Sequence, residues 1–290
     1  MKIYNLGSLN IDYVYSVGHI VRPEETLSSS NLQKFAGGKG LNQSVALSRA
    51  GCSVIHGGII GTDGQFLKDL LQNENVDVSN VKTLVEPTGH AIIQVDSSGQ
   101  NSILLYSGTN YSVDREYIVG FLKDAQEGDI LLLQNEVSAI KDAFEIAHNK
   151  KMQIAFNPSP YSHQLKELPL QYVKWWFCNE IEAKELFLTD DAQQVAQNFI
   201  TNYPNSNLIL TLDEKGSVFI SKDAFIKQEA YKTKVVDTTA AGDTFTGYFL
   251  SAVSQKMSIN DAMRLASKAA SITVSRKGAS PSIPYFNELV

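Results

Sequence analysis

The sequence is poor in cysteine and contains no long apolar run. Its two cysteines, Cys52 and Cys178, lie far apart and have no metal-ligand spacing around them, which predicts two reduced, mainly structural thiols. No apolar stretch approaches the length of a membrane span. The N-terminus passes directly from Lys2 into a predicted strand, without the apolar core of a signal peptide. These features predict a cytoplasmic protein.

Basic residues are also fewer than acidic residues. The 290 residues include 25 Lys and Arg against 31 Asp and Glu, which gives a formal net charge of -6. A nucleic acid or an anionic membrane surface would repel such a chain at long range, so neither is an expected partner. Any anionic ligand must therefore be held by a local site.

The chain contains no low-complexity tract, internal repeat or Pro/Ser-rich linker, so one domain spanning residues 1–290 is expected. Apolar strand-like runs alternate with helical periods, which predicts an α/β fold: a central, mostly parallel sheet with helices on both faces. The predicted strands are residues 3–6, 54–60, 130–134, 153–157, 175–178 and 208–212. The predicted helices are residues 39–50, 65–72, 114–123, 139–149, 191–203, 241–255 and 260–275. Ligands of such sheets bind at the carboxyl ends of the strands.

Two segments interrupt this alternation, at about residues 13–36 and 89–107. The first has short, weakly alternating runs, and the second contains a predicted hairpin with a turn at residues 96–99. Together they predict a small β-sheet lid over the end of the main sheet, which would exclude water from a reaction there. The alternative is that they are ordinary peripheral strands.

The segment 237–245 (DTTAAGDTF) predicts a turn that leads into a helix. Residues 233–236 before it alternate like the end of a strand, and Phe245, Phe249 and Val253 recur every four residues after it. The first turn of a helix leaves backbone N–H groups without partners and favours negative charge, so it can hold a phosphate. The predicted anion pocket consists of the amides of Ala241, Gly242 and Asp243.

Asp243 itself would lie beside that pocket. A carboxylate in this position can accept a proton from a hydroxyl group, as phosphoryl transfer to an alcohol requires. The alternative is that Asp243 only caps the helix, because aspartate is common at helix starts.

Residues 37–42 (GGKGLN) are glycine-rich but do not form a P-loop. A P-loop needs a glycine separated by four residues from the Gly-Lys pair and Ser or Thr after it, and these positions hold Gln33 and Gly40. The segment instead suits close approach and hydrogen bonding to a polyhydroxylated ligand. Asn10 and Asp12 after the first strand can bind adjacent hydroxyls, although a turn role is the alternative for both.

Asn179 and Glu182 follow the predicted strand 175–178, and their spacing puts both on the first helical turn after it. Their position at the carboxyl end of a strand favours a role in ordering hydrated Mg2+ and phosphate, since Mg2+ keeps several waters. The alternative is a capping arrangement, which has the same spacing.

Several motifs together resemble the pfkB, or ribokinase-like, carbohydrate kinases over nearly the full chain. They are GSLNID at 7–12, GGKGLN at 37–42, GTDG at 61–64, NPSP at 157–160, NEIE at 179–182, DTTAAGDTF at 237–245 and RKGASPS at 276–282. The resemblance implies a three-layer α/β/α sandwich with a β-sheet lid. It also implies transfer of the γ-phosphate of ATP to a primary hydroxyl of a monosaccharide, with D-ribose as the expected acceptor and D-ribose 5-phosphate as the product.

The resemblance implies roles for individual residues. Asp243 matches the catalytic base, and Ala241 and Gly242 match the anion hole. Sugar contacts are implied for Asn10, Asp12, Gly38, Lys39, Asn42, Glu136 and Asp243. Nucleotide or Mg2+ contacts are implied for Asn179, Glu182, Thr211, Asp213, Gly216, Gly242 and Ser267. A loop that binds an activating K+, in several places through backbone carbonyls, is implied for Asp237, Thr239, Thr273, Arg276, Gly278 and Ser282. A homodimer through the lid is implied as well.

The chain departs from the family pattern at three positions. Asp213 stands where a glycine is usual in the nucleotide turn, Ser267 replaces a base-contacting histidine, and Glu24 replaces a glycine of the lid. A carboxylate near a polyphosphate should repel it unless it turns to solvent. Two other functions therefore stay open: a related kinase for another pentose, a ketose or a nucleoside, and a catalytically silent sugar-binding regulator. The set of sugar contacts favours ribose.

Overall fold

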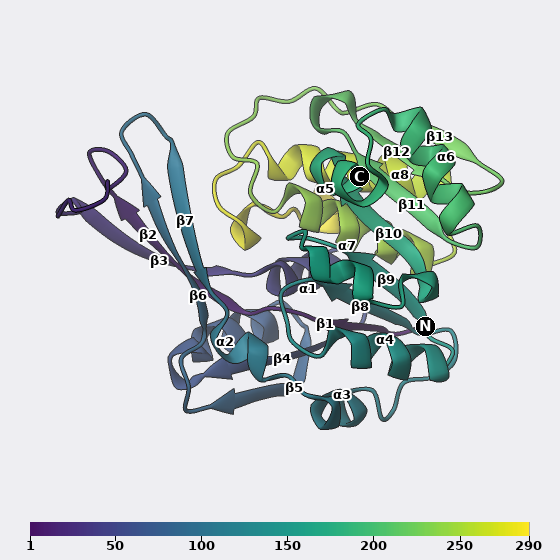
Figure 1. Ribbon diagram of the computed structural model, residues 1–290, viewed down its shortest axis with the longest axis horizontal. Coiled ribbons are helices and arrows are strands. Elements are labelled where there is room, and N and C mark those ends of the chain that lie inside the picture. The colour runs from purple at the N-terminus through teal and green to yellow at the C-terminus, as the bar shows by residue number, and fades with distance from the viewer. Residues whose placement is uncertain (290) are drawn as a thin grey trace.

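A nine-stranded sheet forms the centre of the protein, in the order β13-β12-β11-β10-β9-β8-β1-β4-β5 (Figure 1). The structure is a computed structural model that describes residues 1–289. The strands from β11 to β5 in this order run parallel, and β12 and β13 extend one edge antiparallel. Their bounds are β1 (Ile3–Leu6), β4 (Val54–Gly61), β5 (Asp77–Leu84), β8 (Ile130–Gln134), β9 (Gln153–Asn157), β10 (Val173–Asn179), β11 (Asn207–Thr211), β12 (Ser217–Ile220) and β13 (Phe225–Gln228).

Helices cover both faces of this sheet and make a three-layer sandwich. An apolar cluster that includes Phe144 and Phe199 packs α3 to α6 against one face. A second cluster, with Tyr248 and Phe249, packs α1, α2, α7 and α8 against the other face. The helices are α1 (Lys39–Arg49), α2 (Gln65–Asn73), α3 (Arg115–Phe121), α4 (Ile140–Asn149), α5 (Glu180–Phe187), α6 (Ala192–Asn202), α7 (Ala241–Ser254) and α8 (Ile259–Thr273).

A separate four-stranded sheet, in the order β3-β2-β6-β7, extends away from the main body, at the left of Figure 1. It consists of β2 (Asn10–Ser16), β3 (Asn31–Gly37), β6 (Gly89–Val95) and β7 (Asn101–Tyr106). The β7 strand is exposed along its whole length, and Ile103 and Leu104 are 59% and 68% exposed. This sheet therefore presents apolar side chains to solvent.

The predicted fold class is confirmed: a mostly parallel central sheet between helices, with a small separate sheet. The strand predicted at residues 233–236 was wrong, because this segment is an exposed loop. It is held instead by the N–H groups of Val236 and Asp237, which both donate to the carbonyl of Val274 at the end of α8. No helix within residues 1–289 is long and apolar enough to cross a membrane.

Candidate active site

A cavity of about 200 Å3 opens at the carboxyl ends of β9, β10 and β11, beside the first turn of α7. Parallel sheets commonly bind ligands at this edge. The cavity is lined by Lys39, Asn157, Ser159, Phe177, Cys178, Asn179, Glu182, Thr211, Thr238, Ala240, Ala241, Gly242, Asp243 and Thr246. Segments far apart in the sequence therefore meet around one opening.

Asp243 is buried in the first turn of α7, and its side chain does not cap the helix. The N-cap is Ala240, which has a left-handed φ of 62° and makes no side-chain cap bond. The Asp243 carboxylate instead accepts hydrogen bonds from two neighbouring side chains of α1. Asn42 Nδ2 donates to Oδ2 over 3.2 Å, and Gln43 Nε2 donates to Oδ1 over 2.9 Å. Capping therefore does not explain this aspartate.

The amides of the predicted anion pocket differ in their hydrogen bonds. The N–H of Ala241 donates to the carbonyl of Thr238 over 3.2 Å, so this amide already completes a turn. In the described part of the chain, the N–H groups of Gly242 and Asp243 have no such partner. The space beside the Gly242 Cα is open. Gly242 and Asp243 therefore supply the two free donors at this helix start.

Lys39 lies among three carboxylates at the cavity. Burial disfavours its charged form, but the negative charges of Asp243, Glu136 and Glu182 outweigh burial, and the pKa of Lys39 is raised. Glu136 is held by its neighbours, since the Ser8 hydroxyl and the Lys39 N–H both donate to its Oε2 atom. The ammonium group of Lys39 therefore remains charged and offsets the negative charge of this region.

A second, smaller cavity of about 50 Å3 lies where the small sheet meets the main body. Its lining residues are Asn10, Leu105, Ser107, Asn110, Tyr111, Asn135, Glu136 and Pro160. Asn110 fixes the orientation of Asn10: its Oδ1 accepts from the Leu9 N–H at 3.0 Å, so its Nδ2 donates to Asn10 Oδ1 at 2.7 Å. The Nδ2 group of Asn10 is thus left as a donor for a ligand.

Asp12, in β2, packs against Gly37 of the neighbouring strand β3. Burial, and secondly the negative charge of Glu136, raise the pKa of Asp12 to about 6. Among the described residues, none donates a hydrogen bond that would lower the pKa of Asp12. A half-buried carboxylate without a protein donor is suited to accept hydrogen bonds from ligand hydroxyls.

Asn179 and Glu182 form the capping box that was the alternative interpretation of their spacing. The Glu182 N–H donates to Asn179 Oδ1 over 2.8 Å, and the Asn179 N–H donates to Glu182 Oε2 over 3.0 Å. Both residues also line the first cavity. The two residues therefore cap α5 and also line the cavity. Their role in binding Mg2+ stays a prediction.

The predicted nucleotide turn follows β11. Thr211 lines the first cavity, whereas Asp213, Gly216 and Ser267 are not among its lining residues. Asp213 has a left-handed φ of 48°, the conformation that a glycine adopts without strain. Gly216 has a φ of 94°, and a Cβ there would collide with the carbonyl of Gln228. Ser267 is buried in α8.

Most of the predicted cation residues lie in two loops that Asp237 joins, and Thr273 is the last residue of α8. Its Oδ1 accepts from the N–H and hydroxyl of Thr239, at 2.9 and 2.6 Å, and its Oδ2 accepts from the Gly278 N–H at 2.9 Å. These hydrogen bonds outweigh the effect of burial and lower the pKa of Asp237. Of the other members, Thr273 bonds to Thr244, and Ser282 bonds within its own loop.

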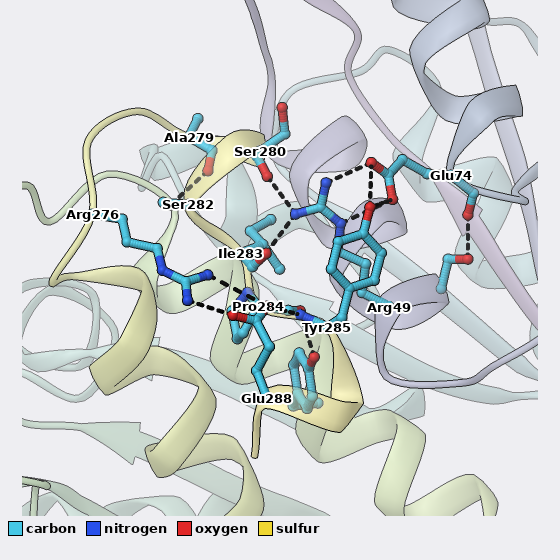
Figure 2. A network of polar contacts seen from close by, with 12 residues as sticks. Arg49, Glu74, Arg276, Ala279, Ser280, Ser282, Ile283, Pro284, Tyr285 and Glu288 are labelled. Carbon is cyan, nitrogen blue, oxygen red and sulfur yellow. Dashed lines mark hydrogen bonds and ion pairs between the residues drawn. The ribbon is translucent and has the colours of Figure 1, made fainter. Parts of the chain in front are cut away.

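The C-terminal segment is fastened to α1 by Arg49 (Figure 2). The guanidinium group donates to both carboxylate oxygens of Glu74 and to the carbonyls of Ser280 and Ile283. It also lies 4.4 Å from the ring centroid of Tyr285. Arg276 forms a separate ion pair with Glu288. Across residues 1–289, no cluster of His, Cys, Asp and Glu side chains is arranged to hold a metal ion.

Comparison with protein-family models matches residues 2–285 to the pfkB family carbohydrate kinases. The chain belongs to this family. A related ribokinase of Haemophilus influenzae is 36% identical over 291 residues, covering 96% of this chain and 94% of the relative. The resemblance read from the motifs is thereby confirmed.

Solved structures agree with the pfkB assignment. A ribokinase from Cryptococcus neoformans var. grubii, in complex with ADP, matches with a TM-score of 0.87 at 33% identity. The match covers 99% of this chain and 98% of that one. A ribokinase of Arabidopsis thaliana, complexed with ribose and ATP, also has a TM-score of 0.87, at 27% identity, with 99% and 97% covered. The three-layer sandwich is thus the fold of this pfkB kinase.

Sequence reasoning missed three polar residues around Asp243 of this pfkB kinase. Gln43 bonds directly to Asp243, and Gln134 and Asn157 bond to Gln43. A signal was present for two of them. Gln134 and Asn157 are the last residues of β8 and β9, at the edge where parallel sheets bind ligands. Gln43 follows directly on Asn42, which was predicted to bind the sugar.

Proposed function

We propose that this protein transfers the γ-phosphate of ATP to the O5 hydroxyl of D-ribose and releases ADP and D-ribose 5-phosphate. One observation carries the proposal: Asp243 lies beside two free amides at a cavity edge and makes no capping bond. The carboxylate is therefore available as a base next to an anion pocket. The relatives named ribokinase, and the one solved with ribose and ATP, support this acceptor and donor.

In the proposed reaction, the Asp243 carboxylate accepts the proton of the acceptor hydroxyl as that oxygen attacks the γ-phosphorus. The bond from phosphorus to the ADP oxygen breaks, and its electron pair leaves with ADP. The amides of Gly242 and Asp243, together with the Lys39 ammonium, stabilise the negative charge on the transferred group. Catalysis therefore rests on positioning and charge rather than on a covalent intermediate with the protein.

The sugar is proposed to lie between the first turn of α1 and the start of the small sheet. Donors there are Asn10 Nδ2 and Lys39, and acceptors are Asp12 and Glu136. Asn42 Oδ1 is buried without a partner in the described chain, so it can accept a ligand hydroxyl. Gly38 allows close approach of the α1 start, since it has a left-handed φ of 99°.

The nucleotide is proposed to follow the edge of the sheet from Thr211 and the turn at Asp213 and Gly216, with its phosphates near Asn179 and Glu182. The cavity fits this role because it is lined by amide, hydroxyl and carboxylate groups around the free N–H donors of α7. Mg2+, when bound, would neutralise phosphate charge. Ser267 is proposed to lie near the heterocyclic base of the nucleotide. Because Ser267 is buried in α8, this contact would be indirect.

An activating K+ is proposed at the two loops that Asp237 joins. The hydrogen bonds from Asp237 to Thr239 and Gly278 hold the loops together beside α7, and Gly278 has a left-handed φ of 87°. Such loops present carbonyl oxygens, which are suitable ligands for a hard cation. The remaining proposed members of this loop region are Thr273, Arg276 and Ser282.

A homodimer is proposed to form through the small sheet, with residues 13–36 and 89–107 acting as a lid on a single domain. The exposed apolar side chains of Ile103 and Leu105, which alternation places on one face of β7, support this, because exposed apolar surface marks interaction sites. A monomeric mass by light scattering would contradict it.

A cytoplasmic location is also proposed, in line with the free cysteines Cys52 and Cys178.

The experiment that tests the function is a panel of acceptors with ADP release as the readout. Purified protein receives ATP, Mg2+ and K+ with ribose, other pentoses, fructose or a nucleoside. Ribose is expected to have the highest kcat/KM. A higher value for fructose or a nucleoside would replace the acceptor. Calorimetric ribose binding without ADP release from any acceptor would instead establish a silent sugar-binding regulator.

A further inference from the structure

Gln43 is the fifth residue of α1 and is completely buried, and its side chain faces the carboxylate of Asp243. Its Nε2 group donates to Asp243 Oδ1 over 2.9 Å and to Asn157 Oδ1 over 3.4 Å. Its Oε1 atom accepts from Gln134 Nε2 over 2.7 Å. Every polar atom of this amide therefore has a partner that depends on its orientation.

A series of hydrogen bonds fixes the orientation of the Gln43 amide. It begins at the backbone carbonyl of Gly40 and passes through the side-chain amides of Asn5 and Gln134. Asn5 Nδ2 donates to the carbonyl of Gly40 over 2.8 Å, so Asn5 Oδ1 must face the other way. That oxygen accepts from Gln134 Nε2 over 2.9 Å. The same Nε2 group then donates to Gln43 Oε1, which turns the N–H groups of Gln43 toward Asp243. A carbonyl cannot donate a hydrogen bond, so none of the three side-chain amides can flip without losing hydrogen bonds. We call these three residues, Asn5, Gln134 and Gln43, the amide chain.

A second backbone carbonyl enforces the same orientation from the opposite side. Asn157 Nδ2 donates to the carbonyl of Phe177 over 2.8 Å, which leaves Asn157 Oδ1 facing Gln43 as an acceptor. A flipped Gln43 would place its own oxygen against both Asn157 Oδ1 and the Asp243 carboxylate. Two independent sets of contacts therefore orient the Gln43 N–H groups toward Asp243. One comes from Asn5 in β1 and Gln134 in β8, and the other comes from Asn157 in β9 and the Phe177 carbonyl in β10.

Gly7 belongs to the same arrangement. A Cβ at this position would collide with Gln134 Oε1 and with the Cα of Gly40. Gln134 Oε1 is buried and has no hydrogen-bond partner within residues 1–289. The chain of amides thus tolerates one unpaired oxygen so that the Gln134 Nε2 group can serve both Asn5 and Gln43.

We propose that Gln43 is a positioning residue for the base: it engages Oδ1 of Asp243 and leaves Oδ2 to take the proton of the acceptor hydroxyl. Oδ2 has the longer bond, 3.2 Å, to the Nδ2 group of Asn42, whose own Oδ1 is buried and unpartnered. A hydroxyl group that donates to Oδ2 lies next to Asn42. The proposal rests on the proposed function, in which Asp243 is the base.

The charged groups near Asp243 do not come from the amide chain. They are Lys39 on α1, Glu136 after β8 and Glu182 on α5. The far end of the chain leads from Asn5 through Ser44 to His56, whose burial lowers its pKa to about 3. His56 is therefore neutral, and replacing Gln43 by a neutral side chain removes donors without adding or removing a charge.

The test is the variant Gln43→Met, which keeps the length of the side chain and removes both donors. The Asp243 carboxylate is followed by 13C NMR of aspartate-labelled protein, and its signal is identified by its loss in Asp243→Asn. Loss of this charge-assisted hydrogen bond should move the 13C signal of the Asp243 carboxylate at pH 7. At pH 7, kcat should fall roughly tenfold while KM for the sugar changes less than threefold.

Two further variants separate positioning from general damage. Gln134→Met does not touch Asp243 and should move the same 13C signal in the same direction by a smaller amount, whereas the exposed Gln72→Met should leave it unchanged. An unmoved signal in folded Gln43→Met, or a moved signal with unchanged kcat, overturns the proposal. Absence of turnover in the wild-type protein contradicts the proposed function instead, and the carboxylate signal still decides whether Gln43 holds Asp243.

Discussion

The side chains of Asn42 and Asp243, 201 residues apart, are joined by a hydrogen bond of 3.2 Å from Nδ2 to Oδ2. It links the first turn of α1, which belongs to the proposed sugar site, to the first turn of α7, which belongs to the proposed transfer site. The proposed base and a proposed acceptor-binding amide are thus positioned by each other. Changes at either residue should affect turnover more than folding.

Asp243→Asn should lower kcat by roughly 10²-fold to 10⁴-fold, because an amide cannot accept the hydroxyl proton. The variant should keep its fold, since the apolar contacts of α7 through Tyr248 and Phe249 are unchanged. The measurement is steady-state ADP release, with circular dichroism and sugar-binding calorimetry as controls. Near-wild-type turnover in the folded variant would exclude Asp243 as the base.

The pKa of Asp12 near 6 predicts a pH dependence of sugar use. If the ionised carboxylate accepts hydroxyl hydrogen bonds, kcat/KM for the sugar should decrease as the pH falls through about 6. The measurement is kcat/KM from pH 5 to 8, in wild type and in Asp12→Asn. The variant should have a much higher KM and lack this acidic decrease. An identical decrease in the variant would assign it to another group.

Asp12 should also make stability depend on pH. Its folded pKa is raised above the unfolded value, so its favourable contribution exists below about pH 4 and is lost as the pH rises through about 6. Asp12→Asn should therefore stabilise the unliganded protein at pH 8, by about 2 kcal/mol, and much less at pH 4. Thermal unfolding at both pH values measures this. The exposed Asp223→Asn serves as the control and should change neither.

Activity should be higher in K+ than in Na+ or choline buffer at equal ionic strength. Asp237→Ala should remove this stimulation, because it breaks the hydrogen bonds to Thr239 and Gly278 that join the two loops. Initial rates in the three buffers provide the measurement, and Asp223→Ala is the matched control. Equal wild-type rates in all three buffers would count against a cation at these loops.

Arg49→Met should destabilise the protein by about 3 kcal/mol, because it leaves the poorly exposed carboxylate of Glu74 without its partner. It also releases the carbonyls of Ser280 and Ile283 (Figure 2). Urea unfolding gives the change in the free energy of unfolding. The control is Arg264→Met, whose ion pair is exposed on α8, and it should stay within about 0.5 kcal/mol. Equal effects of the two variants would refute the role of burial.

The central strands were predictable because they are short apolar runs. β8 (ILLLQ) is buried at every position, and its bounds agree with the prediction. β5 was missed because it is an edge strand of mixed polarity, in which mainly Val78 and Val81 are buried. β13 was missed because it is an edge strand without a fully buried residue, and β12 was missed although all four of its residues are buried. Apart from β12, local patterns thus reveal buried strands better than edge strands.

The motifs pointed to the proposed base and the proposed sugar-binding residues, but they did not supply the contacts between them. Asp243 and the helix-start prediction were compatible with capping, and only the bonds to Asn42 and Gln43 excluded it. The reverse holds for Asn179 and Glu182, where the capping box formed. The sequence spacing is the same in both interpretations. What separates them is the tertiary partner of the side chain, which local spacing does not contain.

The most direct measurement is the identity of the product. Purified protein is incubated with ATP, Mg2+, K+ and D-ribose, and the reaction is followed by 31P NMR. Stoichiometric ADP and D-ribose 5-phosphate are predicted, and both signals should appear roughly 10²-fold to 10⁴-fold more slowly in Asp243→Asn. ADP accompanied by inorganic phosphate, or no consumption of ATP while ribose binds, would contradict the proposed ribose kinase.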